Sequence, residues 1–165
     1  MLAPTAGSSA QRLFHIVLLF AAFGLAGCDP TVVPTPTREA TTSLAVICEA
    51  EQVGQVRVVE GFFIYPDELT AEPELMLILN SAPGGVEPYV HVSVPVGTGP
   101  NQVEPPPADA SDQDLRVHTA AGEVADMTGR VRVTGTVTAG DMGDGTTCFL
   151  AEPAISLAAD VNPVP

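Results

Sequence analysis

The chain of 165 residues contains no lysine and no tryptophan, and all six of its basic residues are arginines. Twenty acidic residues stand against them, which gives a formal net charge of −14. Affinity for nucleic acid comes mainly from clustered Lys and Arg side chains that neutralise phosphates, so the composition argues against a nucleic-acid partner. Hydrophobic residues make up 45 % of the chain, and this length and composition suffice for one domain with a buried core.

Sequence motifs for catalysis and metal binding are also missing. The chain has no Gly-x-Ser-x-Gly nucleophile elbow and no phosphate-binding Walker loop. His91 and His118 lie far apart, with no cysteine or carboxylate at metal-ligand spacing. Asp141 and Asp144 do not have the spacing of a calcium-binding loop, so a hairpin turn explains them better. We therefore expect no metal, no cofactor and no enzymatic activity.

An export signal occupies the N-terminal end of the sequence. Arg12 precedes an apolar stretch at residues 13–23, and no acidic residue occurs before Asp29. A positive residue followed by a short apolar segment is typical of a secretory signal peptide. The stretch is short for a membrane span, which needs about 20 residues, although an uncleaved membrane anchor is the alternative.

A tetrad shortly after this stretch has the pattern of a processing site. The tetrad Leu25-Ala26-Gly27-Cys28 resembles the lipobox of bacterial lipoproteins. The resemblance implies that residues 1–27 are removed as a signal peptide and that Cys28 carries the lipid, with palmitate among its acyl chains. More than one acyl chain gives stable membrane anchoring. Asp29 resembles a retention signal for the inner membrane, so we expect the protein on the extracytoplasmic face of the bacterial cell membrane.

The mature chain divides into a tether, one domain and a short tail. Residues 28–43 are rich in Pro and Thr and have no apolar period, which is typical of an extended spacer. Residues 44–160 contain β-branched and aromatic segments that predict a β domain, and residues 161–165 should fray.

Five segments of the domain have the pattern of β-strands. In the first, Val56 and Val58 alternate with Arg57, which predicts that the two valines face the core. The third, at residues 89–96, places Tyr89, His91 and Ser93 on the face opposite to its valines. The last should break near Glu152 and Pro153. The five predicted strands are residues 55–65, 75–79, 89–96, 130–138 and 148–157.

The first and fourth of these strands, with Gly61 and Gly135 inside them, resemble the corresponding strands of OB-fold domains. In that family a glycine in the first strand lets the strand bend across both halves of a barrel. We therefore predict a mainly β, five-stranded OB-like barrel with little helix. The chain departs from the usual plan because no convincing helix separates the third and fourth strands. An immunoglobulin-like β-sandwich is the alternative, and it would normally have about seven strands.

Two cysteines remain once Cys28 is assigned to the lipid. In an exported domain an even pair predicts a disulfide between Cys48 and Cys148, and two buried free thiols are the alternative.

Function is predicted only in outline. Tyr89, His91 and Ser93 form a possible ligand-binding face, although such residues are more often the solvated side of a sheet. We expect a non-catalytic binding module in the cell envelope that recognises a protein or a carbohydrate. The alternatives are a solute- or oligosaccharide-binding component, or an enzyme whose site is not visible in the sequence.

Overall fold

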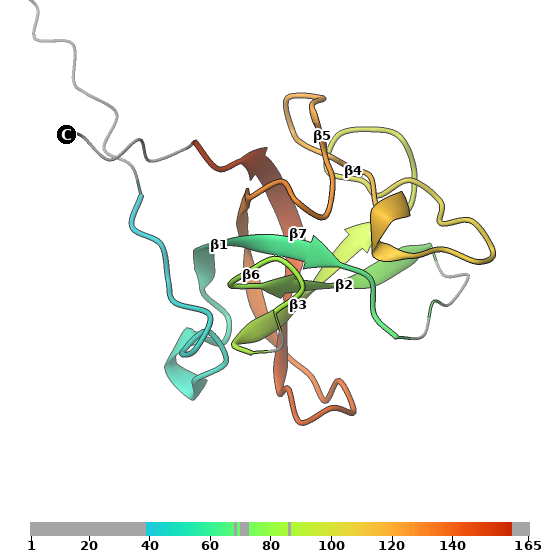
Figure 1. Cartoon of the computed structure of the whole chain (residues 1–165). Coiled ribbons are helices and arrows are strands. Elements are labelled where there is room, and N and C mark those ends of the chain that lie inside the picture. Colours follow the sequence, from blue (N-terminus) through green and yellow to red (C-terminus); the bar gives the residue numbers. More distant parts are fainter. Residues whose placement is uncertain (1–38, 68, 70–72, 86, 160–165) are drawn as a thin grey trace, which may run out of the picture. The chain divides into compact units, whose positions relative to one another are not determined.

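A computed structural model describes residues 39–67, 69, 73–85 and 87–159, and Figure 1 shows its course. The predicted signal peptide, the lipobox residues Leu25, Ala26 and Gly27, and the lipidation site Cys28 lie outside the described residues.

Five strands form a closed barrel, with β1 next to both β2 and β6. Going round the barrel, the order is β1-β2-β3-β7-β6. Strands β3 and β7 run parallel, and every other pairing in the barrel is antiparallel. Because the sheet closes on itself, the predicted OB-like barrel is confirmed and the sandwich is not. The strands are β1 Val56–Ile64, β2 Glu74–Asn80, β3 Tyr89–Pro95, β6 Val131–Ala139 and β7 Cys148–Leu157.

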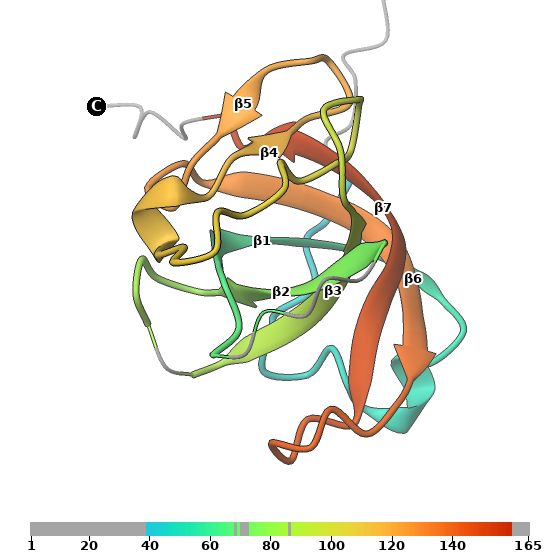
Figure 2. The same cartoon turned by 90° about the vertical axis from the view of Figure 1, so that its right-hand side faces the viewer.

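Small elements lie outside the barrel sheet (Figure 2). The 3-10 helix η1, Ala50–Gln52, precedes β1. The long connection from β3 to β6 contains the 3-10 helix η2, Asp112–Asp114, which Ser111 begins with a capping box. It also contains a two-stranded sheet of β4, Val117–His118, and β5, Val124–Ala125.

Apolar side chains fill the barrel interior. Val59 of β1 pairs with Val133 of β6, and neither residue is exposed to solvent. The prediction that Val56 faces the core is wrong, because Val56 is 58 % exposed. The strand register places Val59 and Phe63 inward instead. The core residues of the five strands are Val59, Phe63, Leu75, Leu77, Leu79, Val90, Val92, Val94, Val131, Val133, Val137, Cys148, Leu150 and Ile155.

Gly61 marks the point where β1 changes partner. The strand pairs with β6 up to Gly61 and with β2 from Phe62 onward. A Cβ atom at Gly61 would lie 2.3 Å from the backbone oxygen of Asn80, so only glycine permits this crossing. The predicted bend in the first strand therefore has a steric cause.

Strand β7 runs unbroken from Cys148 to Leu157, but it is irregular near the residues where the sequence predicted a break. Its register against β6 shifts between Thr134 and Thr136, and Glu152 has a φ of 51°. The irregularity is a β-bulge that bends the strand.

Candidate functional site

An N-terminal segment, residues 39–55, lies against one end of the barrel. Its Leu44 and Ile47 are buried in the core, and the amide of Thr42 donates to the carbonyl of Val58 at 2.6 Å. Cys48 is joined to Cys148 at the start of β7, with an S–S distance of 2.05 Å. The structure thus contains the cysteine pair that the sequence predicted, and this pair fixes the segment beside β7.

The β6–β7 loop, residues 140–147, forms the hairpin turn expected from its sequence. The amide of Gly140 donates to Thr147 O at 2.9 Å, and that of Met142 donates to Thr146 O at 3.1 Å. Gly143 and Gly145 have φ angles of 83° and 94°, a backbone conformation that glycine adopts without strain. The turn therefore places Asp144 at the tip of a compact loop.

Asp144 connects this loop to β3. Its Oδ2 atom accepts a hydrogen bond from the Tyr89 hydroxyl and another from His91 Nε2, both at 2.9 Å. Its Oδ1 atom accepts from the Thr146 amide at 2.9 Å. The Tyr89 and His91 rings also meet edge to face, with centroids 5.8 Å apart. The carboxylate therefore fixes the loop, the tyrosine and the histidine together.

These bonds favour the ionised form of Asp144. Burial raises its pKa, but hydrogen bonds from His91, from Thr146 and from Tyr89 outweigh burial and hold the pKa well below its ordinary value. Because an ionised carboxylate can only accept hydrogen bonds, Nε2 of His91 is the donor in their contact.

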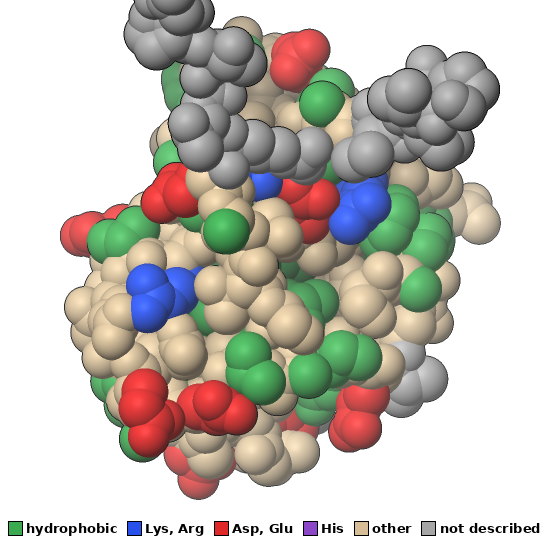
Figure 3. All heavy atoms as spheres, turned by 90° about the vertical axis from the view of Figure 1, so that its left-hand side faces the viewer, with side chains coloured by type: hydrophobic (Ala, Val, Ile, Leu, Met, Phe, Trp, Pro, Cys, Tyr) green, Lys and Arg blue, Asp and Glu red, His purple; other side chains and the backbone are tan. Residues whose placement is uncertain are grey.

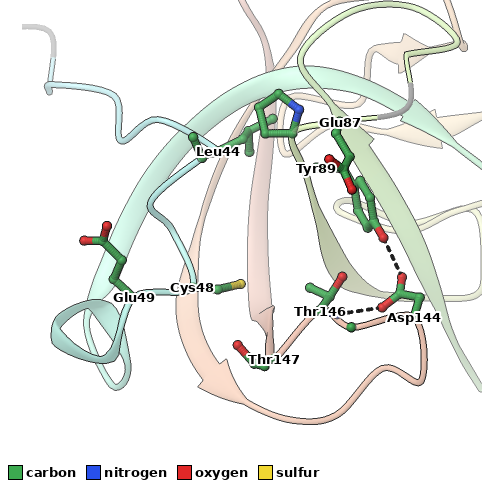
Figure 4. A pocket seen from close by; sticks show the side chains of 11 residues that line it. Leu44, Cys48, Glu49, Glu87, Tyr89, Asp144, Thr146 and Thr147 are labelled. Carbon is green, nitrogen blue, oxygen red and sulfur yellow. Dashed lines mark hydrogen bonds between the residues drawn. The ribbon is translucent and has the colours of Figure 1, made fainter.

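A cleft of about 570 Å³ opens between the N-terminal segment and the β6–β7 loop; we call it the Tyr89 cleft. Figure 4 shows Leu44, Cys48 and Glu49 on one side and Glu87 and Tyr89 on the other, with the loop below. The disulfide thus holds one wall, and the Asp144 hydrogen bonds hold the other. The lining residues are Leu44, Ala45, Cys48, Glu49, Glu87, Pro88, Tyr89, Asp144, Gly145, Thr146 and Thr147.

Only one residue of the predicted ligand face belongs to this site. Tyr89 lines the cleft, whereas His91 lies behind it and reaches it only through Asp144. Ser93 is bonded to Glu74 and does not line the cleft. The interpretation of this face as solvated is wrong for His91 and Ser93, which are 7 % and 8 % exposed.

Three acidic residues of the site were not predicted from the sequence. Glu49, Glu87 and Asp144 come from three separate segments, so no local motif joins them. Asp144 was recognised only as part of a turn. The signal available in the sequence was its Asp-Gly-Thr-Thr context, in which two hydroxyl side chains follow a carboxylate just before a predicted strand.

In the described part of the chain, the arginine side chains bond to residues outside the Tyr89 cleft. Arg130 and Arg132 both contact Glu60, at 3.2 and 2.9 Å. The side chain of Arg57 bonds to Gln52 and Gln55. On the face drawn in Figure 3, the arginine side chains form separate spots, some of them beside acidic side chains, rather than one basic patch.

A second cleft, of about 540 Å³, lies near η2. It contains Asp67, Asp109 and Asp112, and it includes Tyr65, whose side chain is buried in the core. Burial raises the pKa of Tyr65, and the nearby charge of Asp114 raises it further.

Among the described residues, no three or more His, Cys, Asp or Glu side chains are grouped so that they could hold a metal ion. The same part of the chain contains no helix with the length and apolar character of a membrane span. No protein-family model matches the chain, and no curated protein matches it either.

Proposed function

We propose that the protein is a lipid-anchored, extracytoplasmic lipoprotein whose β domain is a non-catalytic binding module in the bacterial cell envelope, with the Tyr89 cleft as its binding site. The observation that carries this proposal is the cleft itself, formed on the outside of a barrel whose interior is filled. Its volume falls within the roughly 300–1,000 Å³ typical of ligand sites. Its lining combines apolar, aromatic, hydroxyl and acidic groups.

The chemistry of Asp144 favours binding over catalysis. A general acid or base works best when its pKa lies near the working pH, and the pKa of Asp144 is held far below that. The Nδ1 atom of His91 is buried and has no hydrogen-bond partner among the described residues. His91 also does not line the cleft, so it does not contact a ligand there directly.

The lipobox tetrad ending at Cys28 supports the anchor, and the predicted tether would carry the domain away from the membrane. An envelope location also agrees with the cysteine pair, since disulfides persist in oxidising compartments.

To test for a binding partner of the cleft, the full chain is expressed in bacteria with a photo-reactive amino acid in place of Ala45. Ala45 is an exposed residue that lines the cleft. The matched control carries the same amino acid at Ala121, which is also exposed and lies in the β4–β5 turn. We expect a discrete crosslinked product from Ala45 that Ala121 does not give. The same products from both positions would contradict a specific site.

The anchor is tested in the same cells. The Cys28→Ala variant should lose palmitate labelling and normal maturation, and it should leave the membrane fraction. Unchanged labelling and processing of this variant would show that the lipoprotein assignment is wrong.

A second candidate function is the binding of a soluble oligosaccharide. The lining favours it, since Tyr89 contributes an aromatic ring and Thr146 and Thr147 contribute hydroxyls, and a sugar presents both apolar and hydroxyl surfaces. Calorimetric titration of the full chain with neutral oligosaccharides tests this candidate.

A further inference from the structure

We propose that the ligand of the Tyr89 cleft is an organic amine, recognised through primary ammonium groups. The inference rests on the proposed function, since it names the chemical class of ligand for the same cleft. The charge of the cleft, the aromatic side chain in its wall and the positions of the protein's own cations support it.

The cleft collects negative charge from three segments of the chain. Glu49 comes from the N-terminal segment, Glu87 from the β2–β3 connection, and Asp144 from the β6–β7 loop. Glu49 and Glu87 are exposed, and neither forms an ion pair with a described residue. A concave surface of one charge sign focuses the electrostatic potential and attracts ligands of the opposite sign.

No described arginine compensates the charge of Glu49 or Glu87 in the cleft. No arginine is among the residues that line the cleft, and the sequence has no lysine. Arg130 and Arg132 are held by Glu60, and Arg116 donates to backbone carbonyls of Gln113 and Leu115. A cationic ligand would therefore meet no competing arginine among the described residues that line the cleft.

Tyr89 supplies a second means of holding a cation. Its ring is partly exposed and lines the cleft, while its hydroxyl is fixed by Asp144 and its ring contacts His91. An ammonium group within about 6 Å of a tyrosine ring is attracted to the ring face. The second cleft is also acidic, but its Tyr65 is buried in the core and cannot present a ring in this way.

Two sources can supply this chemistry, a free polyamine or a lysine side chain of a partner protein. Both place an ammonium group on a flexible, apolar stem. Leu44 and the Cys48 side chain offer apolar surface to such a stem, and the carboxylates offer acceptors to its charged end.

The experiment is calorimetric titration of the full chain, purified in a non-ionic detergent, with 1,5-diaminopentane. We expect sub-millimolar binding that weakens as salt is raised. The double variant Glu49→Gln/Glu87→Gln should bind about tenfold or more weakly, because two unit charges are removed from the cleft. Tyr89→Leu should also weaken binding, since it removes the ring and retains an apolar side chain.

The controls separate this cleft from general attraction to an acidic protein. The double variant Glu51→Gln/Glu123→Gln removes the same charge at exposed positions outside the cleft and should bind like the parent. The neutral analogue 1,5-pentanediol should not bind. Thermal unfolding of each variant confirms that it is folded.

A lysine-containing tripeptide and its norleucine counterpart distinguish the two sources. Tighter binding of the lysine peptide than of the diamine identifies a partner protein, and the reverse identifies a free amine. The inference is overturned if no amine binds, if the diol binds as well as the diamine, or if the control double variant loses as much affinity as the cleft variant. In those cases a crosslink that still forms specifically at Ala45 leaves the proposed function standing, whereas its absence removes both.

Discussion

His91 Nε2 and Asp144 Oδ2 lie 2.9 Å apart although 53 positions separate the two residues in the sequence. The hydrogen bond joins a residue in the middle of β3 to the tip of the β6–β7 loop. The same oxygen accepts a hydrogen bond from the Tyr89 hydroxyl, so one carboxylate fixes the position of one wall of the cleft. The site is therefore held by tertiary contacts rather than by any single strand or turn.

The first prediction concerns Asp144 and acid stability. Because its pKa in the folded protein lies below the ordinary value, its stabilising effect is fully present above about pH 4 and is lost as the pH falls below that. Asp144→Asn should therefore be less stable than the parent at neutral pH, with the difference shrinking in acid. Thermal unfolding followed by circular dichroism from pH 2 to pH 7 measures this difference.

Asp109→Asn is the matched control, an exposed acid that lies in the second cleft. It should follow the parent across the whole pH range. Equal stability of Asp144→Asn and the parent at neutral pH would show that the carboxylate does not hold the loop.

The second prediction concerns Gly61. Gly61→Ala places a Cβ atom 2.3 Å from Asn80 O, a backbone atom that cannot move without opening the β1–β2 pairing. We expect a loss of roughly 1–3 kcal/mol or more in the free energy of unfolding. Gly129→Ala is the control, because its nearest neighbour would lie at an ordinary 3.4 Å. Denaturant unfolding of both variants decides the matter, and equal stabilities would refute the steric explanation.

The third prediction concerns the cysteine pair, which closes a loop with a sequence separation of 100. Replacing both residues, Cys48→Ala/Cys148→Ala, should lower the free energy of unfolding by about 2–5 kcal/mol. It should also weaken diamine binding, because the segment carrying Glu49 is no longer fixed to β7. Denaturant unfolding and calorimetry measure the two effects.

The disulfide itself is tested by mass spectrometry of a non-reduced digest of the exported parent. The two cysteine peptides should be joined, and two freely alkylated thiols would contradict the pair.

The strands could be predicted from the sequence because each has its own local pattern. Residues 130–138 alternate cleanly, and Val131, Val133 and Val137 are indeed buried. The first strand was harder, since Val56, Val58 and Val59 allow two registers. The choice depends on the pairing of Val59 with Val133, which lies far away in the sequence.

The site could be predicted only in part. Tyr89 was found because it belongs to a strand with a clear pattern. Its neighbours Glu49, Glu87 and Asp144 lie in turns and connections, whose local sequence does not determine what they will face. Closure of the barrel and the cysteine pair bring these turns together, and both are long-range effects.

The fourth prediction is that the protein does not bind single-stranded nucleic acid, although OB-like barrels often do. Arg130 and Arg132, the best candidates for phosphate contacts, are already bound to Glu60. Fluorescence anisotropy at physiological ionic strength should show no affinity for an oligonucleotide. Saturable micromolar binding that is lost in Arg130→Ala/Arg132→Ala would show that the fold outweighs the charge.

Ligand binding in the Tyr89 cleft is tested most directly by an NMR titration of the ¹⁵N-labelled full chain with 1,5-diaminopentane. We expect saturable shifts of backbone amides that line the cleft, those of Ala45, Gly145, Thr146 and Thr147. The amides of Asp109, Ser111 and Asp112 in the second acidic cleft should stay in place. Shifts confined to that second cleft, or uniform small shifts across the surface, would contradict binding in the Tyr89 cleft.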